Sequence, residues 1–233
     1  MASSPTTEKV IPYALLGMTA VTGLVDAVSY LSLGRVFTAN MTGNIVLLAF
    51  ATARVSGLSI ARSLTALSAF LVGAILGGRV MARGPADSQI RFAAQAFLLE
   101  VAFLLAASFC ATGYRGGLLD KSFQPFALIV LTALAMGTRN AAVRKLAIPD
   151  LTTTVLTLTI TGIGADASLA KGTNPRLGRR VGSVAAMFLG AAFGAVVIHH
   201  SISAALWLAT AVSAVCGAAM FRSVGTSGSR LSR

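Results

Sequence analysis

The sequence predicts an all-α membrane protein: a polytopic bundle of six full transmembrane helices plus two short or re-entrant ones. Of its 233 residues, 55% are apolar and 11% are charged, and the mean hydropathy is +0.80. Ordinary soluble domains carry about 25% charged residues, so these few charges could not solvate a globule of this size. The composition therefore argues against a soluble enzyme, a disordered chain and a nucleic-acid-binding domain.

Six apolar runs are long enough, or nearly so, to cross about 30 Å of hydrocarbon. They cover residues 11–33, 64–82, 92–112, 126–142, 181–198 and 202–221. The last two are joined by little more than His199, His200 and Ser201, which predicts an antiparallel hairpin. Two shorter runs, 38–53 and 151–165, are rich in Asn and Thr. We expect a single integral membrane domain over residues 1–233, with a flexible tail at 222–233.

The chain also resembles itself, with halves at about 11–112 and 124–221. The stretches 13–20 and 126–133 match at an offset of 113, and Thr38 and Thr42 recur as Thr153 and Thr157 at 115. The glycine pairs Gly73/Gly77 and Gly190/Gly194 match at 117. Internal repeats of this kind are typical of transporters. Each glycine pair has the GxxxG spacing that permits close helix packing, which we expect within one chain rather than between subunits.

The basic residues favour one topology. If the two short runs do not cross, 14 of the 19 Lys and Arg lie on one side and five on the other; if they do cross, the division is 12 to 7. Cytoplasmic loops carry the excess of Lys and Arg, so both alternatives place the two termini in the cytoplasm. The first has three full spans in each half and makes the halves inverted, whereas the second makes them parallel. We favour the first, and leave the second open.

The segment from Arg35 to Asn44 is the most specific in the chain. Asn40, Thr42 and Asn44 are weak helix formers and good helix caps, and they precede a short apolar run. A helix starting there part-way into the bilayer would aim its first N–H groups at the midplane, where a polar or anionic group could bind. Thr153, Thr154 and Thr157 occupy the corresponding place in the second half, although a structural role is the stronger interpretation for these threonines.

Asp26 and Glu100 each lie well within an apolar run. A charge there costs roughly 2.5–3.5 kcal/mol on insertion scales, so each is a candidate functional residue. At the 113 offset Arg139 takes the repeat position of Asp26, and Asn140 follows it. This predicts an Asp26–Arg139 ion pair, either structural or part of a proton or substrate site, and leaves Glu100 without an obvious partner.

The stretch GLVDAVSYLSLGRVFTANMTGNIVLLAFA, residues 23–51, resembles the signature of the YoaK family of bacterial multi-pass membrane proteins, which carry a domain of unknown function. The later stretch PDLTTTVLTLTITGIGAD, residues 149–166, extends the resemblance to nearly the whole chain, although Leu158 stands where the family often has glycine. The resemblance implies a multi-pass protein of the bacterial plasma (inner) membrane. It implies no substrate.

These observations predict a small secondary transporter or channel-like protein with a polar path where the halves meet. The candidate path residues are Asp26, Asn40, Thr42, Asn44, Glu100, Arg139, Asn140, Thr153, Thr154 and Thr157. The alternative is a non-transporting membrane scaffold or assembly module. No motif of a known enzyme class is present, and we expect no catalytic, metal or cofactor site. The expected partners are the lipid bilayer and a small polar or anionic solute, but no nucleic acid, and a second copy of the chain is an alternative left open.

Overall fold

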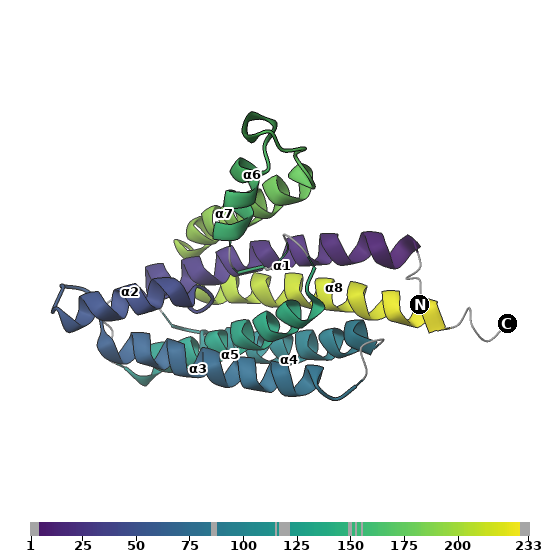
Figure 1. Cartoon of the computed structure of the whole chain (residues 1–233). Coiled ribbons are helices and arrows are strands. Elements are labelled where there is room, and N and C mark those ends of the chain that lie inside the picture. The colour runs from purple at the N-terminus through teal and green to yellow at the C-terminus, as the bar shows by residue number, and fades with distance from the viewer. Residues whose placement is uncertain are drawn as a thin grey trace.

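The fold was analysed in a computed structural model, which describes residues 5–84, 88–114, 116, 122–148, 151, 153, 154 and 156–228. Within those residues the chain is all helical, and no strand occurs (Figure 1). The helices are α1 (Pro5–Ser32), α2 (Met41–Thr52), α3 (Ile60–Met81), α4 (Gln89–Cys110), α5 (Phe123–Leu146), α6 (Thr157–Ala165), α7 (Leu177–Ile198) and α8 (Ile202–Gly228), with a 3₁₀ turn, η2, at Ser168–Ala170.

Six of these helices are long and apolar enough to cross a membrane, and they correspond to the six long runs of the sequence. Their outer faces carry large apolar side chains: Leu71 on α3, Phe193 on α7 and Val215 on α8 are each more than half exposed. Such exposure is unfavourable in water and is normal against lipid tails. The two shorter runs became α2, of 12 residues, and α6, of 9. The prediction of a helical bundle with six full spans and two short helices is confirmed.

The contacts between helices fix their directions. Along α3 and α5 the contact partners advance together, from Gly73 beside Leu134 to Gly77 beside Thr138, so these two helices are parallel. Likewise α1 and α7 are parallel. In contrast, α4 and α8 are antiparallel, because Glu100 bonds Ser213 while the later Ser108 bonds the earlier Ser203. Since short loops make α3 and α4, and also α7 and α8, antiparallel, α1 and α5 run in opposite directions (Figure 1).

The closest helix contacts occur in matching pairs. An ideal Cβ on Gly137 would lie 2.1 Å from the Phe70 oxygen, and one on Gly23 would lie 2.2 Å from the Met187 oxygen. At an offset of 114, Gly137 corresponds to Gly23, and at an offset of 117, Phe70 corresponds to Met187. The two contacts therefore match. The glycines predicted to pack closely do so within the chain, where backbones approach without an intervening side chain.

This matching moves the register between α1 and α5 by one residue from the sequence prediction, from 113 to 114. Asp26 then corresponds to Asn140 and not to Arg139. A shift of one residue rotates a helical position by about 100°, because the α-helix has 3.6 residues per turn. The glycine contacts therefore favour Asn140, and not the predicted Arg139, as the counterpart of Asp26.

The interior consists of two apolar clusters with a polar layer between them. One cluster gathers Val21, Leu24, Leu104 and Met136 with neighbours near one end of the bundle. The other gathers Leu15, Met18, Phe97 and Met220 towards the opposite end, where α1 starts and α8 ends (Figure 1). Thr22, Glu100, Arg139 and Ser213 lie between the clusters and are fully buried.

Candidate functional site

The first short helix is held in place by Asp26 of α1. Its Oδ1 accepts hydrogen bonds from the backbone N–H groups of Thr38 (3.1 Å) and Ala39 (2.9 Å), immediately before α2. Asp26 precedes the end of α1 by six residues, about 9 Å at 1.5 Å per residue. The chain therefore turns back into the bundle after α1, and α2 starts inside it.

Two asparagines of the same segment complete this local structure. Asn40 caps α2, because its Oδ1 accepts from the N–H of Gly43 at 3.3 Å. Asn44 is fully buried, accepts from the Phe37 N–H at 2.9 Å and donates back to the Phe37 carbonyl. Asn44 therefore has a structural role in fixing the loop, while Asn40 is exposed.

The second short helix is held in the corresponding manner. Thr154 Oγ1 donates to Asn140 Oδ1 at 2.9 Å, so that Asn140 of α5 anchors the segment before α6 as Asp26 anchors the segment before α2. Thr153 is buried in a left-handed conformation with φ of 59°. Its hydroxyl has no hydrogen-bond partner within the described structure. Thr157 begins α6, whose N-terminus has no side-chain cap.

The two helix starts face one cavity of about 860 Å³. The first half contributes Asp26, Asn40 and Thr42, and the second half contributes Thr154 and Thr157. Apolar side chains of α1, α2, α6 and α7 form most of the remaining wall, including Leu47, Ile160 and Met187. Five of the ten residues predicted for a polar path therefore meet in one place, from three segments: α1, the start of α2 and the start of α6.

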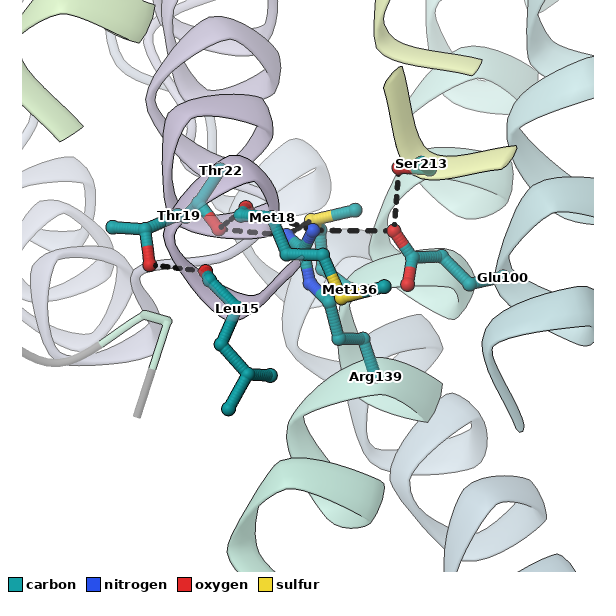
Figure 2. A network of polar contacts seen from close by, with 8 residues as sticks. All are labelled: Leu15, Met18, Thr19, Thr22, Glu100, Met136, Arg139 and Ser213. Atoms are coloured by element: carbon teal, nitrogen blue, oxygen red, sulfur yellow. Dashed lines mark hydrogen bonds and ion pairs between the residues drawn. The ribbon is translucent and has the colours of Figure 1, made fainter. Parts of the chain in front are cut away.

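Glu100 and Arg139 lie outside this cavity, in the polar layer of the bundle (Figure 2). Arg139 Nη1 lies 3.2 Å from Glu100 Oε1, and both side chains have no exposed surface. The same guanidinium donates to the Met18 carbonyl at 3.0 Å and to Thr22 Oγ1 at 2.6 Å on α1, while Ser213 of α8 donates to Glu100 at 3.0 Å. This network ties four helices together.

The ion pair predicted between Asp26 and Arg139 is replaced by the Glu100–Arg139 pair. Arg139 reaches α1 at Thr22, one turn before Asp26, while the next residue, Asn140, bonds Thr154 and holds the segment before α6. The network is incompletely satisfied: Glu100 Oε2 and Arg139 Nε have no hydrogen-bond partner among the described residues. A buried charge pair of this kind depends on both partners being present.

Sequence reasoning missed the aromatic part of the site. Tyr30 and Phe37 line the cavity, with ring centroids 5.0 Å apart and planes at 21°. Tyr30 lies four residues after Asp26, the spacing that places two side chains on one helix face, and this was the available signal. Nothing local identified Ser213 as the partner of Glu100, because that contact depends on how α4 and α8 pack.

The comparisons with known proteins agree with a membrane protein. Residues 14–219 match the family model described as "Protein of unknown function (DUF1275)". The chain is also 39% identical over 156 residues to the UPF0700 transmembrane protein YoaK of Bacillus subtilis (strain 168). That match covers 66% of this chain and 65% of the relative, so it spans just under two thirds of the relative's length. No solved structure matches.

Proposed function

Since the chain belongs to the DUF1275 family, a family of multi-pass membrane proteins whose description names no activity, we propose a function from its own geometry: it is a small secondary transporter or channel-like protein. The solute path runs through the cavity between the starts of α2 and α6. We place the protein in a bacterial plasma (inner) membrane with both termini in the cytoplasm.

One observation carries this proposal. Asn40 and Thr157, from the two Asn- and Thr-rich segments, line the same cavity within a protein that crosses the membrane. Irregular backbone at membrane depth, such as the segments before α2 and α6, is tolerated where protein buries it or where it lines a water-filled cavity. Transporters place their binding sites at such discontinuous helices, near the bilayer centre.

The arrangement of the halves supports the same function. We infer that α1–α4 and α5–α8 form an inverted repeat, because the glycine contacts and the anchors Asp26 and Asn140 recur in matching positions on antiparallel helices. An inverted repeat allows one cavity to open alternately to either side, as rocking of one half closes the path that rocking of the other opens. The glycine faces are occupied by internal contacts, which disfavours the scaffold alternative.

The charge distribution supports the orientation. The end of the bundle where α1 starts holds most of the basic residues near helix ends: Arg79, Arg83, Arg91, Arg144, Lys145, Lys171, Arg176, Arg179, Arg180 and Arg222. The opposite end holds Arg35, Arg54 and Arg62. Short cytoplasmic loops carry the Lys and Arg excess, so the first end faces the cytoplasm.

Accessibility of the cavity to water tests the function. In a Cys110→Ser/Cys216→Ala background, we expect Thr42→Cys and Thr157→Cys to react in membranes with a charged, water-soluble methanethiosulfonate reagent. Both threonines are exposed and line the cavity. Ile45→Cys and Leu158→Cys are the matched controls, on the same two helices, since their side chains are 61% and 76% exposed and lie outside the cavity lining.

The controls should stay unmodified because a thiol in lipid neither ionises nor meets the charged reagent. Failure of the two cavity cysteines to react from either side of the membrane would contradict a solute path. Equal reaction at all four positions would also contradict it, because the cavity would then be no wetter than the lipid-facing surface.

A further inference from the structure

The cavity has a chemistry that selects the charge of its ligand. We propose that it binds an organic cation, a substituted ammonium or phosphonium with an apolar body, whose positive charge lies against Asp26. This inference rests on the proposed function and gives it a substrate class. It also differs from the polar or anionic solute that the helix starts alone suggested. Three properties of the site carry it: its net charge, the geometry of the carboxylate and the aromatic wall.

Asp26 supplies the charge. Of the described residues that line the cavity, Asp26 alone carries a charge. The others have apolar, aromatic, amide or hydroxyl side chains, or are glycine. Arg139 of α5 is the basic residue that contacts the middle of α1, and it is paired with Glu100 at 3.2 Å. Arg139 also attracts Asp26 electrostatically, but its direct ion pair is with Glu100, and Asp26 lines the cavity. A charge in a membrane interior requires a partner, and a cationic ligand provides it.

The carboxylate is positioned to receive such a ligand. Oδ1 of Asp26 accepts backbone hydrogen bonds from Thr38 and Ala39, and the backbone N–H of Asn40 also acts on this carboxylate. These backbone groups hold the side chain in one orientation at the cavity wall, where an incoming cation can approach it. A group fixed before the ligand arrives loses little conformational entropy on binding.

The walls suit an organic ion. Tyr30 and Phe37 stack on each other and line the cavity with Asp26, and the face of an aromatic ring attracts a substituted ammonium. The remaining surface is mostly aliphatic, from Val46, Leu47 and Ile160 among others. The volume of about 860 Å³ lies in the range of sites for drug-sized molecules, about 300–1,000 Å³. A small hydrated metal ion would leave this apolar surface unfilled.

Binding of two ions of the same shape and opposite charge tests the inference. Purified full-length protein in detergent is titrated with radiolabelled tetraphenylphosphonium and, in a separate experiment, with radiolabelled tetraphenylborate, because the two ions precipitate each other when mixed. NaCl is the competitor of the phosphonium. We expect saturable binding of the phosphonium and no saturable binding of tetraphenylborate. Asp26→Asn, which keeps an oxygen acceptor for Thr38 and Ala39, should weaken binding at least about tenfold.

Two variants separate loss of charge from loss of fold. Asp166→Asn makes the same chemical change outside the cavity, at a half-exposed carboxylate paired with Arg180, and should bind as the unmodified protein does. Asp26→Glu keeps the charge and should retain the preference for the cation. If Asp26→Asn lowers the thermal unfolding temperature, Asp26→Glu decides the question by itself.

Four results would overturn the inference: no saturable binding of the phosphonium, equal binding of tetraphenylborate, undiminished binding by Asp26→Asn with its fold intact, or displacement by Na⁺ that disappears in Asp26→Asn. The last would assign the site to an inorganic cation. Any of these results combined with water-accessible Thr42→Cys and Thr157→Cys would leave the solute path standing and reject only the organic cation. Inaccessible cysteines would reject the path itself.

Discussion

Arg139→Met should destabilise the protein by about 3–5 kcal/mol, the usual cost of leaving one member of a buried ion pair without its partner. The substitution keeps a long apolar stem but strands Glu100, which has no exposed surface and keeps a single hydrogen bond from Ser213. It also removes the donors to the Met18 carbonyl and Thr22. A thiol-reactive fluorophore that reports unfolding through the buried Cys216 measures the effect in detergent.

The double variant Arg139→Met/Glu100→Gln tests the reason for that loss. Removing both charges removes the uncompensated carboxylate, so the double variant should be more stable than Arg139→Met alone. Arg144→Met is the matched control, because Arg144 lies on the same helix with its side chain exposed and should change stability by within about 0.5 kcal/mol. If the double variant is no more stable than the single one, the arginine acts through its bonds to α1 and not through Glu100.

Gly73→Ala should destabilise the protein by about 1–3 kcal/mol, the usual cost of forcing an extra methyl group into a packed contact. The new Cβ would lie 2.3 Å from the Leu134 oxygen, a backbone atom that can move only if α5 moves away from α3. Gly190→Ala in α7 should have the same effect, since its Cβ would lie 1.9 Å from the Ala20 oxygen of α1. Thermal unfolding of each variant gives the comparison.

Gly78→Ala provides the control on the same helix. Nothing lies within 4 Å of its ideal Cβ, so alanine should be neutral or stabilise α3 by up to about 1 kcal/mol through its higher helix propensity. The close helix crossings would be refuted if Gly73→Ala and Gly78→Ala unfolded at the same temperature. A loss confined to Gly73 would refute only the matching of the two halves, which predicts equal sensitivity at Gly190.

The sequence predicted the spans well because the length of an apolar run is a local property that the bilayer thickness fixes. The helix ends differ from the ends of the runs by a few residues: α5 continues past Asn140 to Leu146, where Arg144 and Lys145 are exposed. The short helices were also predictable, because Asn40 and the threonines at 153–157 interrupt apolar sequence at matching places.

The contacts between helices were harder to predict. The matched stretches 13–20 and 126–133 favoured an offset of 113, and an error of one residue was enough to pair Asp26 with the wrong side chain. Packing at Gly23 and Gly137 sets the offset at 114, but the oxygens that those glycines meet belong to other helices. The partner of Glu100 had the same dependence on packing. Tyr30 and Phe37 resembled ordinary membrane aromatics until the loop before α2 brought their rings together.

The inverted arrangement of the two halves is the central claim, and the sidedness of two loop positions tests it most directly. Arg54 follows α2 and Lys171 follows α6, both exposed, at opposite ends of the bundle. In a background with Cys110 and Cys216 replaced, Arg54→Cys should react with a membrane-impermeant maleimide in intact cells, and Lys171→Cys only in inside-out vesicles. Reaction of both cysteines from the same side would show parallel halves and contradict the account.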